Sequence, residues 1–354
     1  MKLIVIVAIV CGGASAASAQ SNDAPLTSQE IVRLVYQLPK NPGLRDEIIK
    51  EIRRRGIGFP LTDGLRGVVA TKSGNDALLR RTLEEAERRR LNPTASTLPP
   101  EAETTDVLEK TRNITLAAAD AMPDFVVKEL VTRSLASGST QNWRVLDHLS
   151  YAVSYRAGGS EDYKLLAING QPPNDSIPVK EQLSGGATSA GEFVLTLSYL
   201  FDRERTASFK AADTDVLRGR RTVIYEFQMS RQNSRWRIMD DKHTVISAYH
   251  GRVWVDRETW RVLRLEMVAD LPPDVPAGFY ITQVSSIIDY DWITIGERQY
   301  LLPVRAENII ASSLPGRAAQ ARNEIRFRNY QKFGTEVKII EDDDYEDEPE
   351  EKKP

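Results

Sequence analysis

The feature that most constrains the fold is a change in the spacing of apolar residues near Phe125. Beyond this point, apolar side chains recur at every second position, as in the run from Val223 to Met229. Successive side chains of a strand point to opposite faces, so the alternation predicts strands with one buried face. Similar runs occupy residues 145–155, 284–292 and 325–327. With turn signals such as Asn169-Gly170 between them, these runs predict nine or ten strands in one large antiparallel sheet.

Residues 26–90 have a helical period instead and predict a small bundle of four helices. Thr27 and Glu30 have the spacing of a capping box, and apolar residues three and four apart follow them. The starts of the next three helices are marked by Asn41-Pro42, Leu61-Thr62 and the segment 73–75. A linker rich in proline and threonine is expected over 91–105, and a helix over 106–121.

These patterns together predict an α+β protein. Its main part, over residues 106–335, is expected to be a large curved antiparallel sheet, an incomplete barrel covered by helices. One of the covering helices is predicted from Glu192 to Phe201, between two strands. The all-helical module of residues 26–90 precedes the sheet.

The amino-terminal residues 1–19 are typical of a signal peptide that is cleaved after Ala19. Lys2 precedes the apolar run 3–10, and an A-x-A site ends the segment. The run is far shorter than the roughly 20 residues that span a bilayer, so we expect no membrane-spanning segment. An uncleaved anchor and a lipidated Cys11 are the alternatives, although Val10 is not the small residue that a lipobox needs. The sequence therefore predicts a periplasmic or secreted protein.

The cysteine content and the charge distribution narrow the chemistry further. Cys11 is the only cysteine, so cleavage would leave no thiol for disulfides, metal ligation or nucleophilic attack. The segment 341–354 carries nine acidic residues and two lysines, and we expect it to be a disordered, solubilising tail. The alternative is a tail that binds cations or a partner.

The helical module is basic, with 14 basic and nine acidic residues over 26–90. Arginine runs such as 53–55 and 88–90 lie where predicted helices end, and cations there complement the helix dipole. The alternative is an anionic partner, such as an envelope protein, that binds residues 26–90. Export argues against nucleic acid as that partner.

Motifs for catalysis, cofactors or metals are missing from the sequence. His148, His243 and His250 lack the spacing of a helical metal pair, and neither a nucleophile elbow nor a phosphate-binding loop occurs. Asp289 and Asp291 share one predicted strand face, where cross-strand ion pairs are a simpler interpretation than calcium. We therefore expect no catalytic residue, cofactor or metal, and a hydrolase of unknown type is the enzymatic alternative.

The apolar face of the sheet provides the candidate site. Seven large side chains are expected to project to this one side: Tyr151, Tyr155, Tyr225, Phe227, Met229, Tyr290 and Trp292. Either they pack against the covering helices as a solid core, or the curved sheet holds them around a cavity. The first arrangement suits a scaffold for envelope proteins. The second suits a binding protein that holds a lipid or a lipidated protein segment in a half-barrel.

Four segments carry a resemblance to known proteins: YKLLAING (163–170), GGATSAGEF (185–193), GRVWVDRET (251–259) and YLLPVRAE (300–307). They resemble exported proteins of unknown function from Acidobacteria. The order of elements over about 105–335 also resembles the LolA/LolB-like superfamily, the periplasmic lipoprotein-carrier fold. That resemblance implies an incomplete barrel closed by helices and, by fold analogy, an apolar ligand. It implies no catalytic residues.

Overall fold

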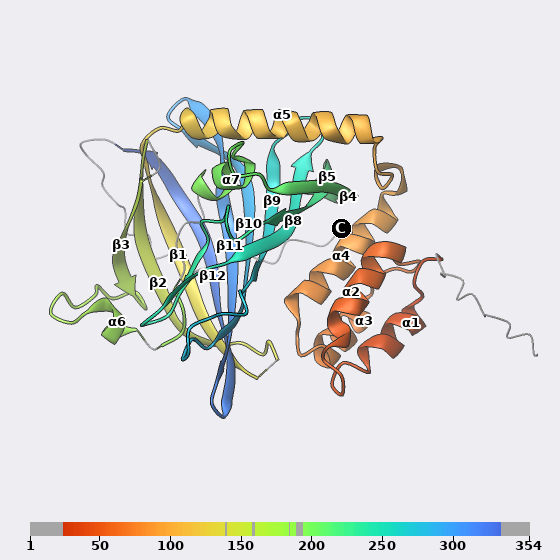
Figure 1. The fold of residues 1–354 in the computed structure, drawn as a ribbon, viewed down its shortest axis with the longest axis horizontal. Helices are drawn as coiled ribbons and strands as arrows, with labels where there is room; N and C mark the ends of the chain where they lie inside the picture. The colour runs from red at the N-terminus through yellow and green to blue at the C-terminus, as the bar shows by residue number, and fades with distance from the viewer. Residues whose placement is uncertain (1–23, 139, 158–159, 184, 189–193, 334–354) are drawn as a thin grey trace, which may run out of the picture.

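The computed structural model describes residues 24–333 except 139, 158–159, 184 and 189–193. The predicted signal peptide (1–19) and acidic tail (341–354) therefore lie outside the described residues. The predicted α+β class is confirmed, because one large antiparallel sheet, whose two edges do not meet, follows a helical part (Figure 1). Among the helices that are described, none is long and apolar enough to cross a membrane.

The large sheet has ten strands in the order β3-β2-β1-β12-β11-β10-β9-β8-β5-β4. Their bounds are β1 (Phe125–Ser137), β2 (Arg144–Arg156), β3 (Ser160–Ile168), β4 (Ser208–Leu217), β5 (Arg220–Met229), β8 (Ala248–Asp256), β9 (Val262–Asp270), β10 (Ile281–Ile295), β11 (Arg298–Leu314) and β12 (Arg317–Lys332). Several pairs shift register, for instance between Arg133 and Ser134 and between Asp289 and Tyr290. Such irregularities increase twist and bend a sheet, which suits its curved shape.

We call the side of the sheet that faces α5 (Glu101–Asp120) and α7 (Val194–Phe201) the inner face. In Figure 1, α5 runs along the top of the sheet, and α7 lies just below α5. The helix predicted over Glu192–Phe201 is described from Val194 on. A short hairpin, β6 (Arg237–Met239) and β7 (Thr244–Ile246), packs through Ile238 and Val245 on Phe279 and Val284, and α6 spans Val179–Gln182.

The helix α5 begins at Glu101, so its predicted start at Asp106 is wrong. Pro100 has the extended backbone of a residue that precedes a helix, and Glu101 and Glu103 place negative charge in the first turn. The linker predicted over 91–105 therefore ends too late, because the first turn of α5 has the polar composition of a linker. A 3-10 turn, Pro93–Ala95, and the segment 96–100 connect α5 to the preceding helix.

The amino-terminal module consists of α1 (Ser28–Val35), α2 (Leu44–Arg55), α3 (Asp63–Lys72) and α4 (Ala77–Leu91). The Thr27–Glu30 capping box is present, and Thr62 and Asp76 cap α3 and α4. Its apolar side chains form a core of their own, separate from the core under α5. The module lies on the other side of the sheet, which we call the outer face (Figure 1).

A close approach of backbone and ring requires glycine at position 251 in β8. A side-chain carbon there would overlap the carbonyl oxygen of Glu266 and come within 2.8 Å of the Phe227 ring. We expect Gly251→Ala to lower the free energy of unfolding by about 3 kcal/mol, since backbone cannot move aside as a flexible side chain can.

Urea unfolding followed by circular dichroism measures this change. Gly67→Ala in α3 is the matched control, because an added carbon there meets nothing within 4 Å. It should raise stability by roughly 0.5–1 kcal/mol through helix propensity. Equal stability of Gly251→Ala and the parent chain would contradict the described packing of β8.

Candidate functional site

The inner face of the sheet brings most of the predicted side chains together in one buried core. The buried members are Tyr155, Tyr225, Phe227, Met229 and Tyr290. Tyr151 is half-buried and packs against the edge of the same core. Side chains of α5 and α7 complete it, namely Val107 from the former and Leu197, Leu200 and Phe201 from the latter.

Trp292 lies outside this core, unlike the other six predicted residues. It is half-buried, and the guanidinium carbon of Arg261 lies 5.5 Å from its ring centroid. The alternation that places Tyr290 inside is interrupted in β10, so Ile293 and Ile295 face the core instead. The register shift beside Tyr290, opposite Pro303, is where the two-residue period is lost.

A row of aromatic rings connects α7 to the sheet, and part of it was missed in the sequence. Phe201 of α7 stacks on Phe209 of β4 at 5.3 Å between ring centroids. Phe209 contacts Phe227, and Phe227 contacts Tyr249, both at 6.0 Å. Phe209 and Tyr249 do occur in alternating segments, so the signal was present. Their place beside α7 depends on contacts between distant parts of the chain.

The space left between the helices and the inner face is small. A pocket of about 30 Å³ lies between α5, α7, β10 and β11, where it is lined by Met122, Leu197 and Tyr290 among others. This volume suits one or two water molecules, whereas pockets for drug-sized ligands measure roughly 300–1,000 Å³. At this position, the space between the helices and the inner face is therefore filled by the protein's own side chains.

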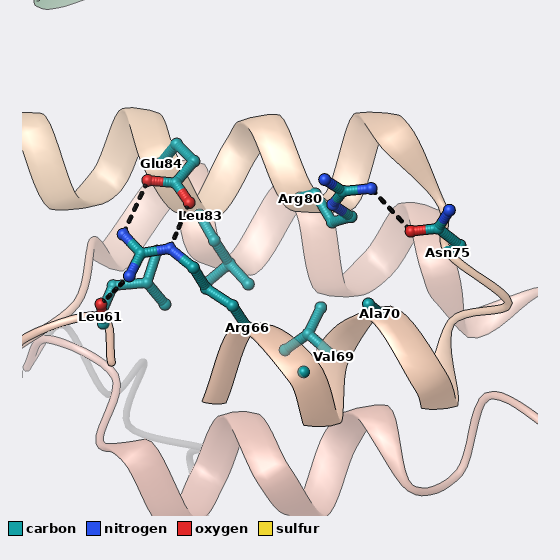
Figure 2. A pocket seen from close by; sticks show the side chains of 9 residues that line it. Leu61, Arg66, Val69, Ala70, Asn75, Arg80, Leu83 and Glu84 are labelled. Carbon is teal, nitrogen blue, oxygen red and sulfur yellow. Dashed lines mark hydrogen bonds and ion pairs between the residues drawn. The ribbon is translucent and has the colours of Figure 1, made fainter. Parts of the chain in front are cut away.

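A larger pocket, of about 280 Å³, lies in the helical module between α3 and α4. Figure 2 shows its apolar wall at Val69 and Leu83. The Arg66 guanidinium donates to both carboxylate oxygens of Glu84 at 2.7 and 3.1 Å, and Arg80 donates to Asn75 at 2.6 Å. This pocket is remote from the aromatic row and contains none of the predicted site residues.

Buried phenols and the buried Glu129 of β1, which lies opposite Tyr151 and Phe327, give the inner face its polar atoms. The Tyr225 hydroxyl donates to the carbonyl oxygen of Thr104 in α5 at 2.6 Å. Burial raises the pKa of Tyr249 to about 12, and it also raises the pKa of Tyr225 and Tyr330. These phenols therefore remain neutral at ordinary pH, and they suit contact with apolar matter or with a hydrogen-bond acceptor rather than proton abstraction.

One ion pair is almost fully buried in β1 and β2. Arg133 donates to both carboxylate oxygens of Asp147 at 2.6 and 2.5 Å, and the two side chains are 2% and 1% exposed. Gly186 lies over this pair, where an added side-chain carbon would be 3.5 Å from the guanidinium. Loss of one partner of such a pair costs about 3–5 kcal/mol, because it leaves the other charge buried and uncompensated.

The histidines and the strand carboxylates lie in separate places. Each histidine contacts a neighbour of its own: His148 contacts Thr132, His243 contacts Asp240 and His250 contacts Asp270. Asp289 accepts from Arg264 on the adjacent strand at 2.8 and 3.0 Å, which confirms the predicted cross-strand ion pair for Asp289. For Asp291 it stays a prediction. Within the described ranges, no group of three or more His, Cys, Asp or Glu side chains is placed to hold a metal ion.

Comparison with known proteins identifies no family for this chain. No protein-family model and no curated protein matches it. A solved DUF1329 family protein from Desulfovibrio piger is similar, at 11% identity over 66% of this chain and 94% of that one, with a TM-score of 0.30. The MucA/MucB complex of Pseudomonas aeruginosa follows, at 9% identity over 63% and 94%, with a TM-score of 0.18. Both are too distant to support an argument, and the LolA/LolB-like and Acidobacteria resemblances stay predictions.

The raised pKa of Tyr249 predicts a loss of stability in alkali. The phenol ionises near its ordinary pKa of 10.0 when unfolded but near 12 when folded. The contribution of this phenol to the free energy of unfolding is therefore complete below pH 10 and is lost as the pH rises through 12. We expect Tyr249 alone to lower the free energy of unfolding by on the order of 2 kcal/mol over this interval.

Urea titrations at pH 9, 10, 11 and 12 test this expectation. Tyr249→Phe should reduce the decrease by about this amount, while Tyr225 and Tyr330, whose pKa values are also raised, continue to contribute. Tyr36→Phe, at an exposed ring of α1's carboxyl end, should retain the whole decrease. A decrease of the same size in Tyr249→Phe and in the parent chain would show that this phenol is not its source.

Proposed function

We propose that this chain is a non-enzymatic binding protein, exported to the periplasm or beyond, whose inner face takes an apolar ligand in place of α7. The ligand class is an acyl chain, carried by a lipid or by a lipidated protein segment. The observation that supports the proposal is the position of α7, a short apolar helix against the aromatic row of the inner face. Tyr155, Tyr225, Phe227, Met229 and Tyr290 would line the vacated space.

The attachment of α7 suits a part that can be displaced. Its described part, Val194–Phe201, has eight residues, and isolated helices shorter than about 12 residues are marginal in water. Its buried side chains, Leu197, Leu200 and Phe201, are all apolar. Apolar contacts are non-directional, so an acyl chain can replace them. In contrast, α5 has 20 residues and is held by the Thr104–Tyr225 hydrogen bond and by the Glu103–Arg257 ion pair at 2.6 Å.

Approximate energies set the size of the ligand. Burial of a large apolar side chain contributes about 1.5–3 kcal/mol, so removal of the three side chains of α7 costs roughly 5–9 kcal/mol. A buried methylene contributes about 0.8 kcal/mol, so ten of them contribute about 8 kcal/mol. The exchange is therefore balanced for chains of about ten or more methylenes. Shorter ligands would not displace the helix.

A second function, a scaffold for envelope proteins with a solid core, is favoured by the close packing under α5 and α7. The pocket of about 30 Å³ between α5, α7 and the sheet is too small for an acyl chain. In that case the inner face stays closed, and partners bind elsewhere, for instance on the basic module of residues 26–90. The two functions differ in whether the inner face opens.

Loss of the Phe201 ring should promote ligand uptake. Phe201→Ala weakens the hold of α7 and leaves space beside Phe209. We expect the fluorescent fatty acid cis-parinaric acid to bind this variant about ten-fold more tightly than the parent chain, measured by fluorescence titration. Native mass spectrometry of the parent chain from its own periplasm should in addition reveal a bound lipid.

Leu83→Ala is the matched control, because it creates a cavity in the separate core of the helical module. It should leave binding of the fatty acid unchanged. If Phe201→Ala folds but takes up no more fatty acid than Leu83→Ala, and the parent chain carries no lipid, the binding proposal is wrong and the scaffold is favoured.

A further inference from the structure

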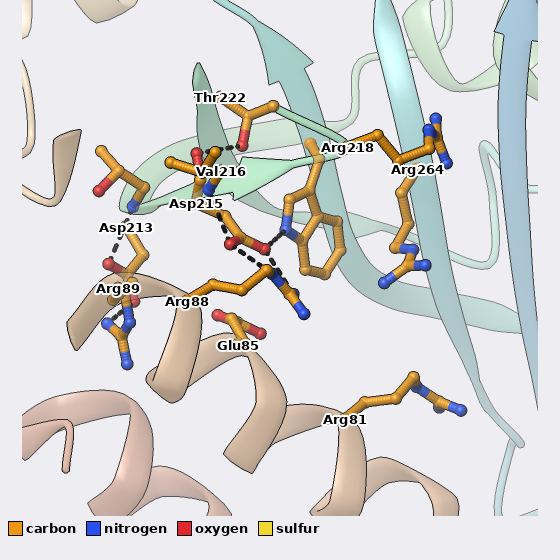
Figure 3. Close-up of polar contacts among 12 residues, drawn as sticks. Arg81, Glu85, Arg88, Arg89, Asp213, Asp215, Val216, Arg218, Thr222 and Arg264 are labelled. Atoms are coloured by element: carbon orange, nitrogen blue, oxygen red, sulfur yellow. Dashed lines mark hydrogen bonds and ion pairs between the residues drawn. The ribbon is translucent and has the colours of Figure 1, made fainter. Parts of the chain in front are cut away.

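The helix α4 has two different faces. Leu79, Leu83 and Ala86 belong to the core of the helical module. The opposite face carries four charged residues that point to the outer face of the sheet: Arg81, Glu85, Arg88 and Arg89 (Figure 3). Their spacing of four, seven and eight places them on one side of a helix.

Each of these charged residues has a partner of opposite charge on the sheet. Arg88 donates to both carboxylate oxygens of Asp215 in β4 at 2.9 and 2.8 Å. The carboxylate oxygens of Glu85 both accept from Arg252 in β8 at 2.9 Å. The remaining pairs are Arg81 with Glu307 of β11 at 3.0 Å and Arg89 with Asp213 of β4. The charges therefore match residue by residue across the interface.

The Glu85–Arg252 pair and the carboxylate of Asp215 are taken out of water, whereas the side chains of Arg88 and Arg81 remain 31% and 29% exposed. The side chain of Asp215 is 0% exposed, and those of Glu85 and Arg252 are each 5% exposed. Burial of charges is costly, and their mutual attraction only approximately offsets this cost. Pairs of this kind fix which surfaces meet and in which register, but they contribute little net free energy of association.

The apolar part of the interface is small by comparison. On the outer face, Leu217, Ile224, Trp254 and Leu263 form a four-residue patch that belongs neither to the module's core nor to the inner-face core. The Trp254 indole donates to Asp215 at 3.1 Å. The guanidinium carbons of Arg252 and Arg264 lie 5.1 and 5.9 Å from the centroid of the Trp254 ring. The patch thus presents one large ring among charged groups.

The second contact of the module with the sheet is also polar. The amide of Ala77, in the first turn of α4, donates to the Gln141 side chain between β1 and β2 at 2.8 Å. Asn75 donates to the Gln141 carbonyl oxygen at 3.2 Å. The module and the sheet thus have complete cores of their own, and polar contacts dominate between them.

We infer that the outer face of β4, β5 and β8 is a helix-docking surface and that α4 is its releasable occupant. The whole module leaves this surface and returns to it as a folded unit, since its departure breaks polar contacts but opens neither large core. Polar interfaces within a chain resemble those of transient complexes, and sub-global opening needs less free energy than global unfolding. The released surface presents Trp254 with the charges that complement α4.

Cysteine labelling distinguishes release of the module from unfolding of the sheet. Val223 and Ile224 are neighbours in β5, both 0% exposed, but Val223 lies in the inner core and Ile224 lies in the covered outer patch. Cysteine replaces one or the other in a chain that carries Cys11→Ser, so each protein has a single thiol. Under native conditions, we expect the thiol of Ile224→Cys to react with a thiol reagent at least about 100-fold faster than that of Val223→Cys.

Charge reversal tests whether the ion pairs hold the module. Glu85→Arg places a cation against Arg252, so it should speed labelling of Ile224→Cys by about ten-fold or more and leave Val223→Cys unchanged. The exchange Glu85→Arg with Arg252→Glu should restore slow labelling. Equal rates at positions 223 and 224 in the parent chain would overturn the proposal, as would a Glu85→Arg variant that accelerates both positions equally. The comparison in the parent chain is decisive even if Glu85→Arg fails to fold.

Discussion

The burial of one apolar face of an open sheet is the constraint on which the rest of the structure depends. The sheet ends at β3 and β4 without closing, so its inner face must be covered by other elements. The helix α5 lies along it and accepts a hydrogen bond from Tyr225, and α7 fills the space beside the aromatic row. Because the cover comes from the same chain, the inner face is a core in this state and a binding site only if α7 leaves.

The sequence predicted those parts of the fold that depend on local period. In β5, Tyr225, Phe227 and Met229 all face the inner core, because a regular strand keeps its alternation. Trp292 was misplaced because the two-residue period of β10 is lost after Tyr290, beside a bulge at Val304 of β11, and a bulge in the partner strand is not predicted by the spacing of β10. Whether α7 fills the inner face could not be predicted either, since this depends on how tightly Phe201 and Phe209 pack.

The arginines of α4 illustrate a different limit. Their position near the end of the helix suggested a favourable interaction with the helix dipole or an anionic partner protein. The arginines do lie in the last turn, and two of them also pair with Asp213 and Asp215 of β4, more than 120 positions away in the chain. The anionic partner of this helix face is the sheet itself. A partner so distant in sequence leaves no trace in the local pattern, because the charge of a helix face does not reveal what it meets.

The strand β4 contains residues on which both proposals depend. This strand is at the edge of the sheet and is paired only with β5, so it is restrained on one side. Its inner side carries Phe209, which stacks on α7, and its outer side carries Asp213 and Asp215, which hold α4. Only residues 202–207 separate α7 from this strand. A shift of β4 is therefore a short physical connection between the inner face and the module, since this strand contacts α7 on one side and α4 on the other.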